Sequence, residues 1–312
     1  MERELTKGEQ TDADQGGAPG LRAVSVVIVS HNEGDLLRKT VDSFLGSSSV
    51  PDEIVVVDDR STDGSADFLA DGYGDAVLLR PAEQLGISRA RNHGGQRAHG
   101  DVVVFSDAHV EVTEGWLDPI LAALADPEVG EVAPEVGWLD GRPGRGRGFT
   151  WADPSLKMRW LYQDHPEPFD IPFICGCFLA MRRELFEQVG GFDDGMYRWG
   201  FEDAELSLRL WLQGYRCQAV SQSFIRHHFR PDFPYQVDRS GIVYNALRLA
   251  TLHFDEPAIE RVIGQFCTEP AFGRAWARLL DSDTWDRREA IAGRRRREFR
   301  WFLGEVGIDA LG

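Results

Sequence analysis

The sequence predicts an α/β fold with a mainly parallel sheet flanked by helices, of nucleotide-binding character. Two observations support this prediction. First, short apolar runs typical of buried strands alternate with helical patterns from residue 24 to residue 136. Second, the runs at 24–30, 53–58 and 102–106 all end in polar residues. Ligands of an open parallel sheet bind beyond the carboxyl ends of its strands, so we expect these ends to share one site.

The first half of the chain supplies most of the expected parallel sheet. Leu37, Val41, Phe44 and Leu45 lie at helical spacing and form an apolar stripe, which identifies the helix after the first strand. The expected strands are 24–30, 53–58, 77–79 and 102–106, and the expected helices are 35–45, 65–69 and 87–98.

The second half continues the pattern less regularly. A loop at 140–148 is indicated by its four glycines and three arginines. The predicted helix that begins at Glu202 or Asp203 ends at Gly214, a residue typical of helix C-termini. The other expected elements are a helix at 116–125, a strand at 131–136, a central strand at 171–181, a helix at 183–189 and a helical, basic segment over the last 45 residues.

These elements define one domain after a polar, glycine-containing leader. We expect residues 1–21 to be disordered. Residues 22–312 form the domain, divided into a nucleotide-binding half (22–135), an acceptor or catalytic half (136–267) and a helical C-terminal extension (268–312).

Composition limits the class of protein. The 312 residues include 42% apolar and 11% aromatic ones, enough for a large core. The net charge of −17 argues against a nucleic-acid partner, and an acidic protein that handles a phosphorylated metabolite needs a local cation. Four irregularly spaced cysteines do not indicate a disulfide framework. With neither a long apolar segment nor a secretory signal, the sequence predicts a soluble, cytoplasmic protein without a membrane span.

A candidate metal site follows the strand at 102–106. Asp107 and His109 offer a carboxylate and an imidazole one residue apart, and one histidine of the later pair His227-His228 can complete a ligand set. Such an ion can hold a diphosphate. The alternative is ordinary: an Asp-x-His after a strand is also typical of a turn or helix cap, and a His-His pair beside an arginine is often a packing feature.

Two further groups of polar residues are candidates for binding and catalysis. Asp58 and Asp59, with His31, can contact a uracil or a ribose, although Asp-rich turns with no binding role have the same pattern. The adjacent Glu202 and Asp203 can bind an acceptor hydroxyl or serve as a general base. Carboxylates at a helix start can equally be caps that complement the helix dipole.

Several segments together resemble a known family in both order and spacing. They are 27–33 (VIVSHNE), 53–59 (EIVVVDD), 86–91 (GISRAR), 107–109 (DAH), 115–117 (GWL), 191–193 (GFD), 199–207 (WGFEDAELS), 227–230 (HHFR), 234–235 (PY) and 299–303 (FRWFL). The chain resembles the polypeptide N-acetylgalactosaminyltransferases, which belong with the GT-A glycosyltransferases of the family 2 and 27 type. The resemblance covers about residues 24–310.

The resemblance implies a function for most of the candidate residues. It implies that Asp107, His109 and His227 hold Mn²⁺, or Mg²⁺, on the diphosphate of a UDP-sugar donor. The implied donor-binding residues are His31, Asp58, Asp59, Arg89, Gly176, Trp199, Arg230 and Tyr235. Among them, Arg230 and Tyr235 lie on a loop that closes over the phosphates, and Trp199 moves with that loop. Glu202 and Asp203 are the implied catalytic pair.

The sequence departs from the family at three places. Glu202-Asp203 stands where the family has Glu-Asn, and this pairing occurs in inverting relatives, so retention and inversion are both open. Gly176-Cys177 replaces a sugar-contacting Gly-Gly pair. The membrane anchor and the C-terminal lectin domain of the family are not expected here, so the acceptor need not be a protein.

The predicted function is therefore metal-dependent transfer of a hexose or N-acetylhexosamine from a UDP-sugar to a hydroxyl acceptor. The acceptor can be a Ser or Thr of a peptide, a glycan or a small molecule. The alternatives are a non-catalytic sugar-nucleotide-binding protein of the same fold, an inverting transferase acting on a glycan or natural product, and a nucleotidyltransferase. The nucleotidyltransferase is disfavoured because residues 31–35 lack a glycine-rich basic loop.

Overall fold

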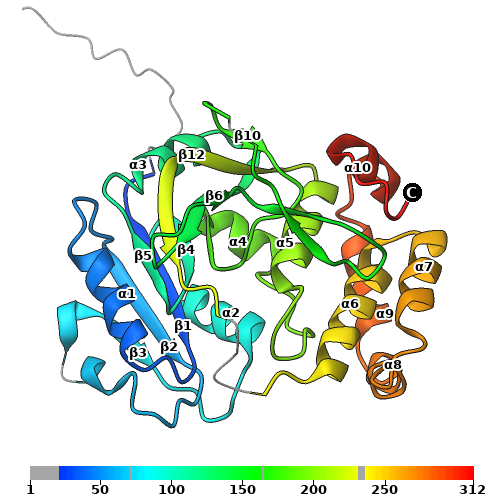
Figure 1. Cartoon of the computed structure of the whole chain (residues 1–312), viewed down its shortest axis with the longest axis horizontal. Helices are drawn as coiled ribbons and strands as arrows, with labels where there is room; N and C mark the ends of the chain where they lie inside the picture. Colours follow the sequence, from blue (N-terminus) through cyan, green and yellow to red (C-terminus); the bar gives the residue numbers. More distant parts are fainter. Residues whose placement is uncertain (1–20, 71, 164, 231–235) are drawn as a thin grey trace, which may run out of the picture.

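The computed structural model describes residues 21–70, 72–163, 165–230 and 236–312. The predicted leader therefore lies, except for Leu21, outside the described residues. The remainder folds as a curled mixed sheet with helices on both faces and a helical C-terminal part at one side (Figure 1). None of the described helices is long and apolar enough to span a bilayer.

The parallel part of the sheet is built from the first half of the chain. β1 (Val24–Ser30) lies between β2 (Glu53–Asp58) and β4 (Val102–Asp107), and β3 (Val77–Leu79) pairs with β2. Ser30 pairs with Asp58, and Val29 pairs with Asp107. The carboxyl ends of the three strands are thus in register, which places the polar residues after them at one edge of the sheet.

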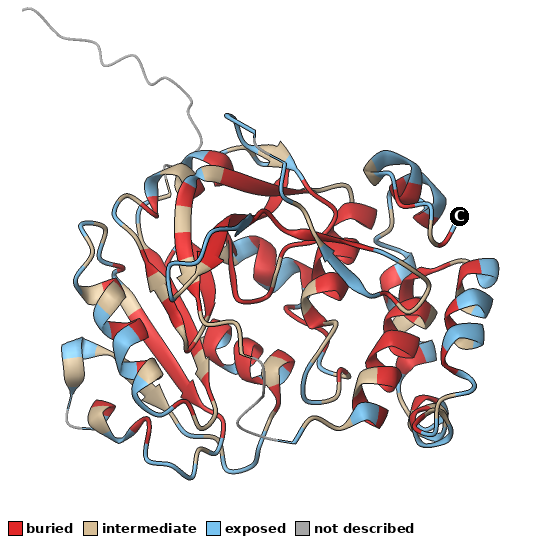
Figure 2. Ribbon diagram, viewed as in Figure 1, coloured by how far each residue is buried: buried red, intermediate tan, exposed pale blue. Residues whose placement is uncertain are grey.

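Alternation along β1 and β2 explains the two layers around this sheet. Val27 and Val57 join a core beneath α2 (Ile87–Arg97), whereas Val26, Ile28 and Val56 join a core with α1 (Asp35–Leu45). Gly94 of α2 faces Val27 so closely that a Cβ there would lie 2.3 Å from the valine side chain. These strands and the inner faces of the helices are buried (Figure 2).

The second half extends the sheet in the order β10-β12-β6-β11-β4-β1-β2-β3. β11 (Phe178–Arg182) is antiparallel to β4 and β6 (Val129–Trp138), and β12 (Arg216–His227) is parallel to β6. The register of β12 shifts between Val220 and Phe224, and its end then pairs with β5 (Val110–Val112), so that His227 lies opposite Val110. The shorter strands are β7 (Arg145–Gly146), β8 (Phe149–Trp151), β9 (Met158–Trp160) and β10 (Phe169–Asp170).

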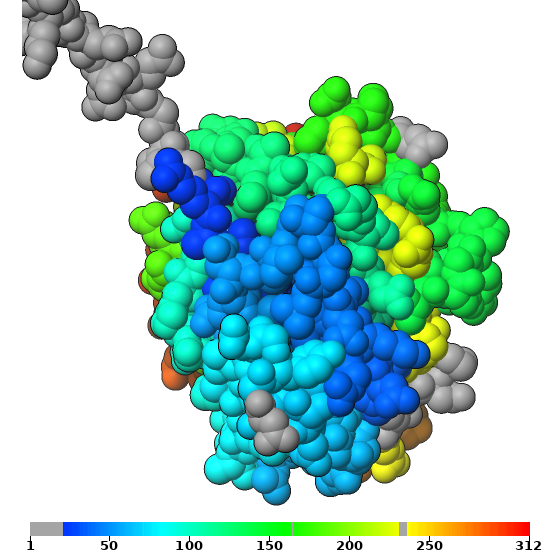
Figure 3. All heavy atoms as spheres, turned by 90° about the vertical axis from the view of Figure 1, so that its left-hand side faces the viewer, coloured from blue at the N-terminus to red at the C-terminus, as the bar shows by residue number. Residues whose placement is uncertain are grey.

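Helices complete the domain. α5 (Glu202–Leu212) lies beneath the second half of the sheet, and α6 (Arg239–His253) packs against α7 (Glu256–Phe266), α8 (Phe272–Leu280) and α9 (Thr284–Ala292). The other helices are α3 (Asp118–Leu124), α4 (Arg183–Val189), α10 (Phe299–Val306) and the 3₁₀ turns η1 (Asp67–Leu69) and η2 (Tyr73–Asp75). Figure 3 shows that segments from the first third of the chain, coloured blue to cyan, form most of the face turned toward the viewer.

Two expectations about strands were wrong. Only residues 178–181 of the predicted strand 171–181 belong to a strand, β11, because Gly176 and Cys177 form a turn before it. Conversely, no strand was predicted over 216–227, where β12 lies. Polar residues recur along β12, so its sequence lacks the continuous apolar run that predicts a buried strand. Part of the predicted loop 140–148 pairs with β6 as β7.

Candidate active site

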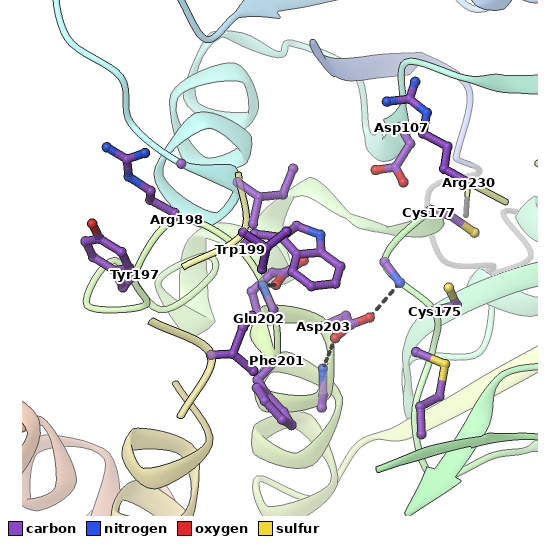
Figure 4. Close-up of a pocket in the computed structure, with 18 of the residues that line it drawn as sticks. Asp107, Cys175, Cys177, Tyr197, Arg198, Trp199, Phe201, Glu202, Asp203 and Arg230 are labelled. Atoms are coloured by element: carbon purple, nitrogen blue, oxygen red, sulfur yellow. Dashed lines mark hydrogen bonds between the residues drawn. The ribbon is translucent and has the colours of Figure 1, made fainter. Parts of the chain in front are cut away.

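A cleft of about 1300 Å³ opens at the carboxyl edge of the sheet. Its lining residues come from the ends of β1 and β4, the segment before β11, the start of α5, the end of β12 and the first helices of the C-terminal part. Figure 4 shows Asp107 and Arg230 on one side of this cleft, Trp199 and Asp203 at its centre, and Tyr197 and Arg198 on the other side.

Asp107, His109 and His227 meet in this cleft. Asp107 ends β4, His109 precedes β5, and His227 ends β12, which pairs with β5. Asp107 Oδ2 lies 3.5 Å from His227 Nε2 and 3.8 Å from His109 Nε2. One possible ligand atom from each residue lies within 4.8 Å of the others. The structure therefore brings together the three predicted ligands from distant parts of the chain.

The environment of these residues suits a divalent cation. His227 is 9% exposed, and apart from the 3.5 Å approach of Nε2 to Asp107 neither ring nitrogen has a hydrogen-bond partner among the described residues. Such buried unpaired polar atoms are uncommon in folded proteins. Burial lowers the pKa of His227 and keeps its ring neutral. Burial alone would raise the pKa of Asp107, but the neighbouring His227, His109 and Arg91 hold it well below its usual value. A carboxylate with a neutral imidazole is a donor set for Mn²⁺ or a similar ion.

Arg91 links the metal-binding corner to the acidic pair. Its buried guanidinium lies 3.2 Å from both Asp107 Oδ1 and Glu202 Oε1, and it donates a 2.5 Å hydrogen bond to the carbonyl of Gly176. Sequence reasoning singled out Arg89 instead. That expectation of placement was wrong: Arg89 is outside the cleft lining and pairs with Glu83 at the surface. The spacing of the small inward-facing residues Ala90 and Gly94 could have identified Arg91 as the buried arginine.

The residues predicted to bind the uridine are divided between the cleft and a neighbouring turn. His31 Nδ1 lies 2.8 Å from the carbonyl oxygen of Asp59, and both residues line the cleft. The Asp59 carboxylate accepts hydrogen bonds from the backbone of Leu85 and Gly86, which fixes the loop before α2. Asp58 does not line the cleft. It accepts from Ser61 N and pairs with Arg80, so its observed contacts are those of an Asp turn.

Glu202 and Asp203 start α5 behind a strained turn. Gly200 has a φ of 101°, which a glycine accommodates readily. Phe201 has a φ of 70°, which is strained for a residue with a side chain. Glu202 Oε2 accepts from Gly200 N at 2.9 Å. The two oxygens of Asp203 accept from Gly176 N at 2.9 Å and Ala204 N at 2.7 Å.

The electrostatic environment of the pair favours a bound proton. Burial and the adjacent charge of Asp203 raise the pKa of Glu202 to about 7, against the opposing effect of Arg91. Burial also raises the pKa of Asp203, although the two backbone N–H groups oppose the shift. Two interacting carboxyls of this kind titrate as a unit, so the raised pKa values belong to the pair.

Gly176, Trp199 and Arg230 all line the cleft. A Cβ on Gly176 would lie 3.1 Å from Arg91 Nη1 and 3.2 Å from Asp203 Oδ2, so a larger residue would have to displace these side chains slightly. Trp199 is 39% exposed. Arg230 pairs with Glu33, whose carboxylate also lies 3.1 Å from His109 Nδ1.

Glu33 and Tyr235 complete the account of this region. Sequence reasoning did not single out Glu33, although it ends the motif His31-Asn32-Glu33 at the same strand end. Tyr235, the other predicted residue of the closing loop, lies outside the described residues.

Comparison with known proteins identifies the class. A family model described as "Glycosyl transferase family 2" matches residues 25–190, and one described as "N-terminal domain of galactosyltransferase" matches residues 162–231. The first covers more than half of the chain, so the protein belongs to glycosyl transferase family 2. The predicted GT-A fold is also confirmed by a solved structure, "GalNAc-T7 with UDP, GalNAc and Mn2+", with a TM-score of 0.78 and 26% identity over 94% of this chain and 58% of that one.

Within that class, the predicted resemblance to polypeptide N-acetylgalactosaminyltransferases is confirmed. The chain is 32% identical to Polypeptide N-acetylgalactosaminyltransferase 11 of Xenopus tropicalis, over 92% of this chain and 51% of the relative. It is 34% identical to Polypeptide N-acetylgalactosaminyltransferase 8 of Drosophila melanogaster, over 76% and 44%. The chain spans about half the length of these curated relatives. The mannosyltransferase PcManGT of Pyrobaculum calidifontis shares the fold, with a TM-score of 0.52 and 20% identity over 92% of this chain and 86% of that one.

Proposed function

We propose that this protein transfers a hexose or N-acetylhexosamine from a UDP-sugar to the hydroxyl of a Ser or Thr in a peptide, with the help of a divalent metal ion. The observation that carries the proposal is the convergence of Asp107, His109 and His227 in a cleft shared with the Glu202-Asp203 pair. The relatives named as polypeptide N-acetylgalactosaminyltransferases support the sugar and acceptor classes. The related structure with UDP, GalNAc and Mn²⁺ supports the donor and the ion.

The three ligands would hold Mn²⁺ or Mg²⁺, which when bound supplies positive charge to the diphosphate of the leaving UDP. Arg91 contacts Asp107 at 3.2 Å and, together with His227 and His109, keeps the pKa of that carboxylate low. Arg230 lies beside this corner and would add positive charge near the phosphates when it exchanges Glu33 for the donor. His31 and Asp59 line the donor end, where the uridine would bind.

Glu202 and Asp203 would serve the acceptor hydroxyl. The pKa of Glu202 is raised to about 7 and that of Asp203 is raised by burial, which suits groups that take up a proton. If Asp203 removes the acceptor proton directly, the product has the inverted anomeric configuration. If the departing diphosphate takes that proton, the configuration is retained. Proton NMR of the anomeric position of the product distinguishes the two outcomes.

The proposal is tested by incubating the protein with UDP-hexoses and UDP-N-acetylhexosamines, with a Ser/Thr peptide, and with either Mn²⁺ or EDTA. We expect UDP release and sugar transfer that require the ion, and a loss of at least 100-fold in the His227→Ala variant. Tight binding of the UDP-sugar without UDP release in any of these mixtures would contradict catalysis. Such a result would instead support a non-catalytic sugar-nucleotide-binding protein.

A further inference from the structure

The charges that line the cleft are divided between its two ends. Five of its six carboxylates lie at the donor and catalytic end, namely Glu33, Asp59, Asp107, Glu202 and Asp203. The helical part and the β8–β9 hairpin contribute a single carboxylate, Asp238, together with Lys157, Arg239 and Arg274. Arg198 precedes Trp199 and lies on the far side of Asp203 from Asp107 in Figure 4. We call Lys157, Arg198, Arg239 and Arg274 the cationic rim.

Most of the cationic rim has no carboxylate partner. Lys157, Arg198 and Arg274 are exposed, and none of them forms an ion pair within 4 Å with a described residue. Arg239 does form one, with Glu269. Asp238, the one carboxylate that these elements contribute to the cleft lining, is 4.0 Å from Arg278 and accepts hydrogen bonds from Ser240. Asp153 of the same hairpin as Lys157 lies outside the lining and interacts with the charge of this lysine only beyond ion-pair distance.

The positive charge of the cationic rim is opposite in sign to the net charge of the protein. The chain carries a net charge of −17, yet four cations from four separate elements line one end of its main cleft. A cleft with one sign of charge and low-dielectric walls concentrates the field inside it, and therefore attracts ligands of the opposite sign. Aromatic walls lie beside the rim: Trp151, Trp160 and Tyr197 line the same cleft.

We propose that the cationic rim selects an acidic acceptor, namely a peptide whose Ser or Thr is flanked by glutamate or aspartate. This inference rests on the proposed function, because it assigns the acceptor to the end of the cleft beyond Asp203. Guanidinium and ammonium groups bind flanking carboxylates as an extended peptide lies across the aromatic walls. The acceptor hydroxyl then lies over Glu202 and Asp203, while the UDP-sugar occupies the opposite end.

The test measures peptide binding by fluorescence anisotropy in the presence of UDP and Mn²⁺. Three labelled peptides share a central threonine and differ only in flanking residues, which are glutamate, glutamine or lysine; a fourth carries flanking phosphoserine. We expect the glutamate peptide to bind at least ten-fold more tightly than the lysine peptide at low salt. High salt should reduce this ratio, because exposed charges are screened.

The double variant Lys157→Gln/Arg274→Gln should reduce the ratio to within about three-fold, with an unchanged melting temperature. Lys39→Gln, an exposed lysine on α1 outside the cleft, is the matched control and should keep the wild-type ratio. Equal binding of the three unphosphorylated peptides, or an unchanged ratio in the double variant, would overturn the proposal. Binding of the phosphoserine peptide alone would also overturn it, in favour of a phosphorylated acceptor.

Failure of the proposed function gives a different result. Metal-dependent release of UDP with water as the acceptor reports on donor chemistry without any peptide. If that release is observed and the peptides bind without regard to charge, only the acidic-acceptor inference fails. If UDP is not released but the charge ratio and its loss in the double variant are observed, the rim binds acidic peptides and the proposed transfer fails.

Discussion

Arg91 is the residue on which the active-site carboxylates depend. It contacts Asp107, Glu202 and the carbonyl of Gly176 from a fully buried position. We expect Arg91→Lys to lower transfer activity at least 100-fold, because an ammonium cannot reproduce the three-way contact of a planar guanidinium. It should also reduce the free energy of unfolding by about 3 kcal/mol, since buried charges lose a partner. Steady-state kinetics and urea unfolding measure both effects.

Arg89→Lys is the matched control for this substitution. The guanidinium of Arg89 is half-exposed and pairs with Glu83 at the surface. Such an ion pair contributes about 1 kcal/mol or less to the free energy of unfolding. Transfer activity should therefore stay within a few-fold of wild type. A large loss in Arg89→Lys, together with a mild effect of Arg91→Lys, would restore the role that the family resemblance implied for Arg89.

Asp203 offers the sharpest test of the proton acceptor. Its carboxylate is held between Gly176 N and Ala204 N, and its pKa is raised by burial. We expect Asp203→Asn to lower kcat about 100-fold, which is the lower end of the usual contribution of general-base catalysis. UDP affinity, measured by calorimetry, should be unchanged. A kcat within a few-fold of wild type would show that another group takes the acceptor proton.

Glu131 should make the stability of the protein depend on pH. Burial raises its pKa to about 7, and Ser207 donates a hydrogen bond to it within the core. Because the folded state holds this proton more tightly than the unfolded state, the stabilisation is present below about pH 4.5 and is lost as the pH rises through 7. The Glu131→Gln variant should remove this effect. Relative to wild type, its free energy of unfolding should rise by about 2 to 3 kcal/mol between pH 5 and pH 8.

The measurement for Glu131 is urea unfolding of both proteins at several pH values. The amide of the variant can still accept the hydrogen bond from Ser207, so packing is preserved. A constant difference between the two proteins across this range would mean that Glu131 has an ordinary pKa in the folded state.

At the scale of elements, helix α6 positions the loop that leads into the acidic pair. The buried side chain of Asn245 accepts from Tyr197 N at 2.7 Å and donates to the carbonyls of Tyr197, Trp199 and Gly200 at 3.0, 3.2 and 2.8 Å. This single amide satisfies four backbone groups of a loop whose last residues have positive φ. It therefore fixes the backbone of the loop that carries Trp199.

Asn245→Asp keeps the shape of the side chain but replaces its N–H donors with an acceptor. We expect the free energy of unfolding to fall by about 2 kcal/mol, because buried carbonyls lose their donors. If Asn245 is a positioning residue, KM for the acceptor should also rise about ten-fold, while KM for the UDP-sugar stays close to wild type. A loss of stability with both KM values unchanged would assign a purely structural role to Asn245.

The elements of residues 22–135 were the most predictable part of the fold. Their apolar runs are short, buried and bounded by polar residues, so the bounds of β1, α1, β2 and β3 match the expected ones. β12 escaped prediction because its pairing partners β6 and β5 come from earlier, separate segments, and its polar residues mask the pattern. Long-range pairing, rather than local propensity, determines that strand.

At the scale of the whole molecule, the convergence of the three candidate metal ligands was predicted, whereas the residues that contact them were not. Asp107, His109 and His227 could be proposed because their residue types and family spacing point to a cation. Arg91 and Glu33 gained importance only when the sheet brought separate strand ends together. A sequence lists the residues at each strand end, whereas the contacts between those ends depend on topology and register.

Metal binding should stabilise the folded protein. An ion that binds only the folded state raises the free energy of unfolding, by about 2.7 kcal/mol at a concentration 100 times its Kd. We expect Mn²⁺ to raise the melting temperature of the wild-type protein but not that of His227→Ala. Differential scanning calorimetry with and without EDTA measures the effect. An equal rise in the two proteins would place the ion elsewhere.

The large separation of His227 from Asp107 in the sequence has a consequence for refolding. Its imidazole can approach Asp107 only after β12 has paired with β6, with a register shift after Val220, and with β5. Because such distant pairings form slowly, uptake of Mn²⁺ during refolding should lag behind the recovery of helical signal. Uptake of the ion would then report when pairing of the sheet is complete.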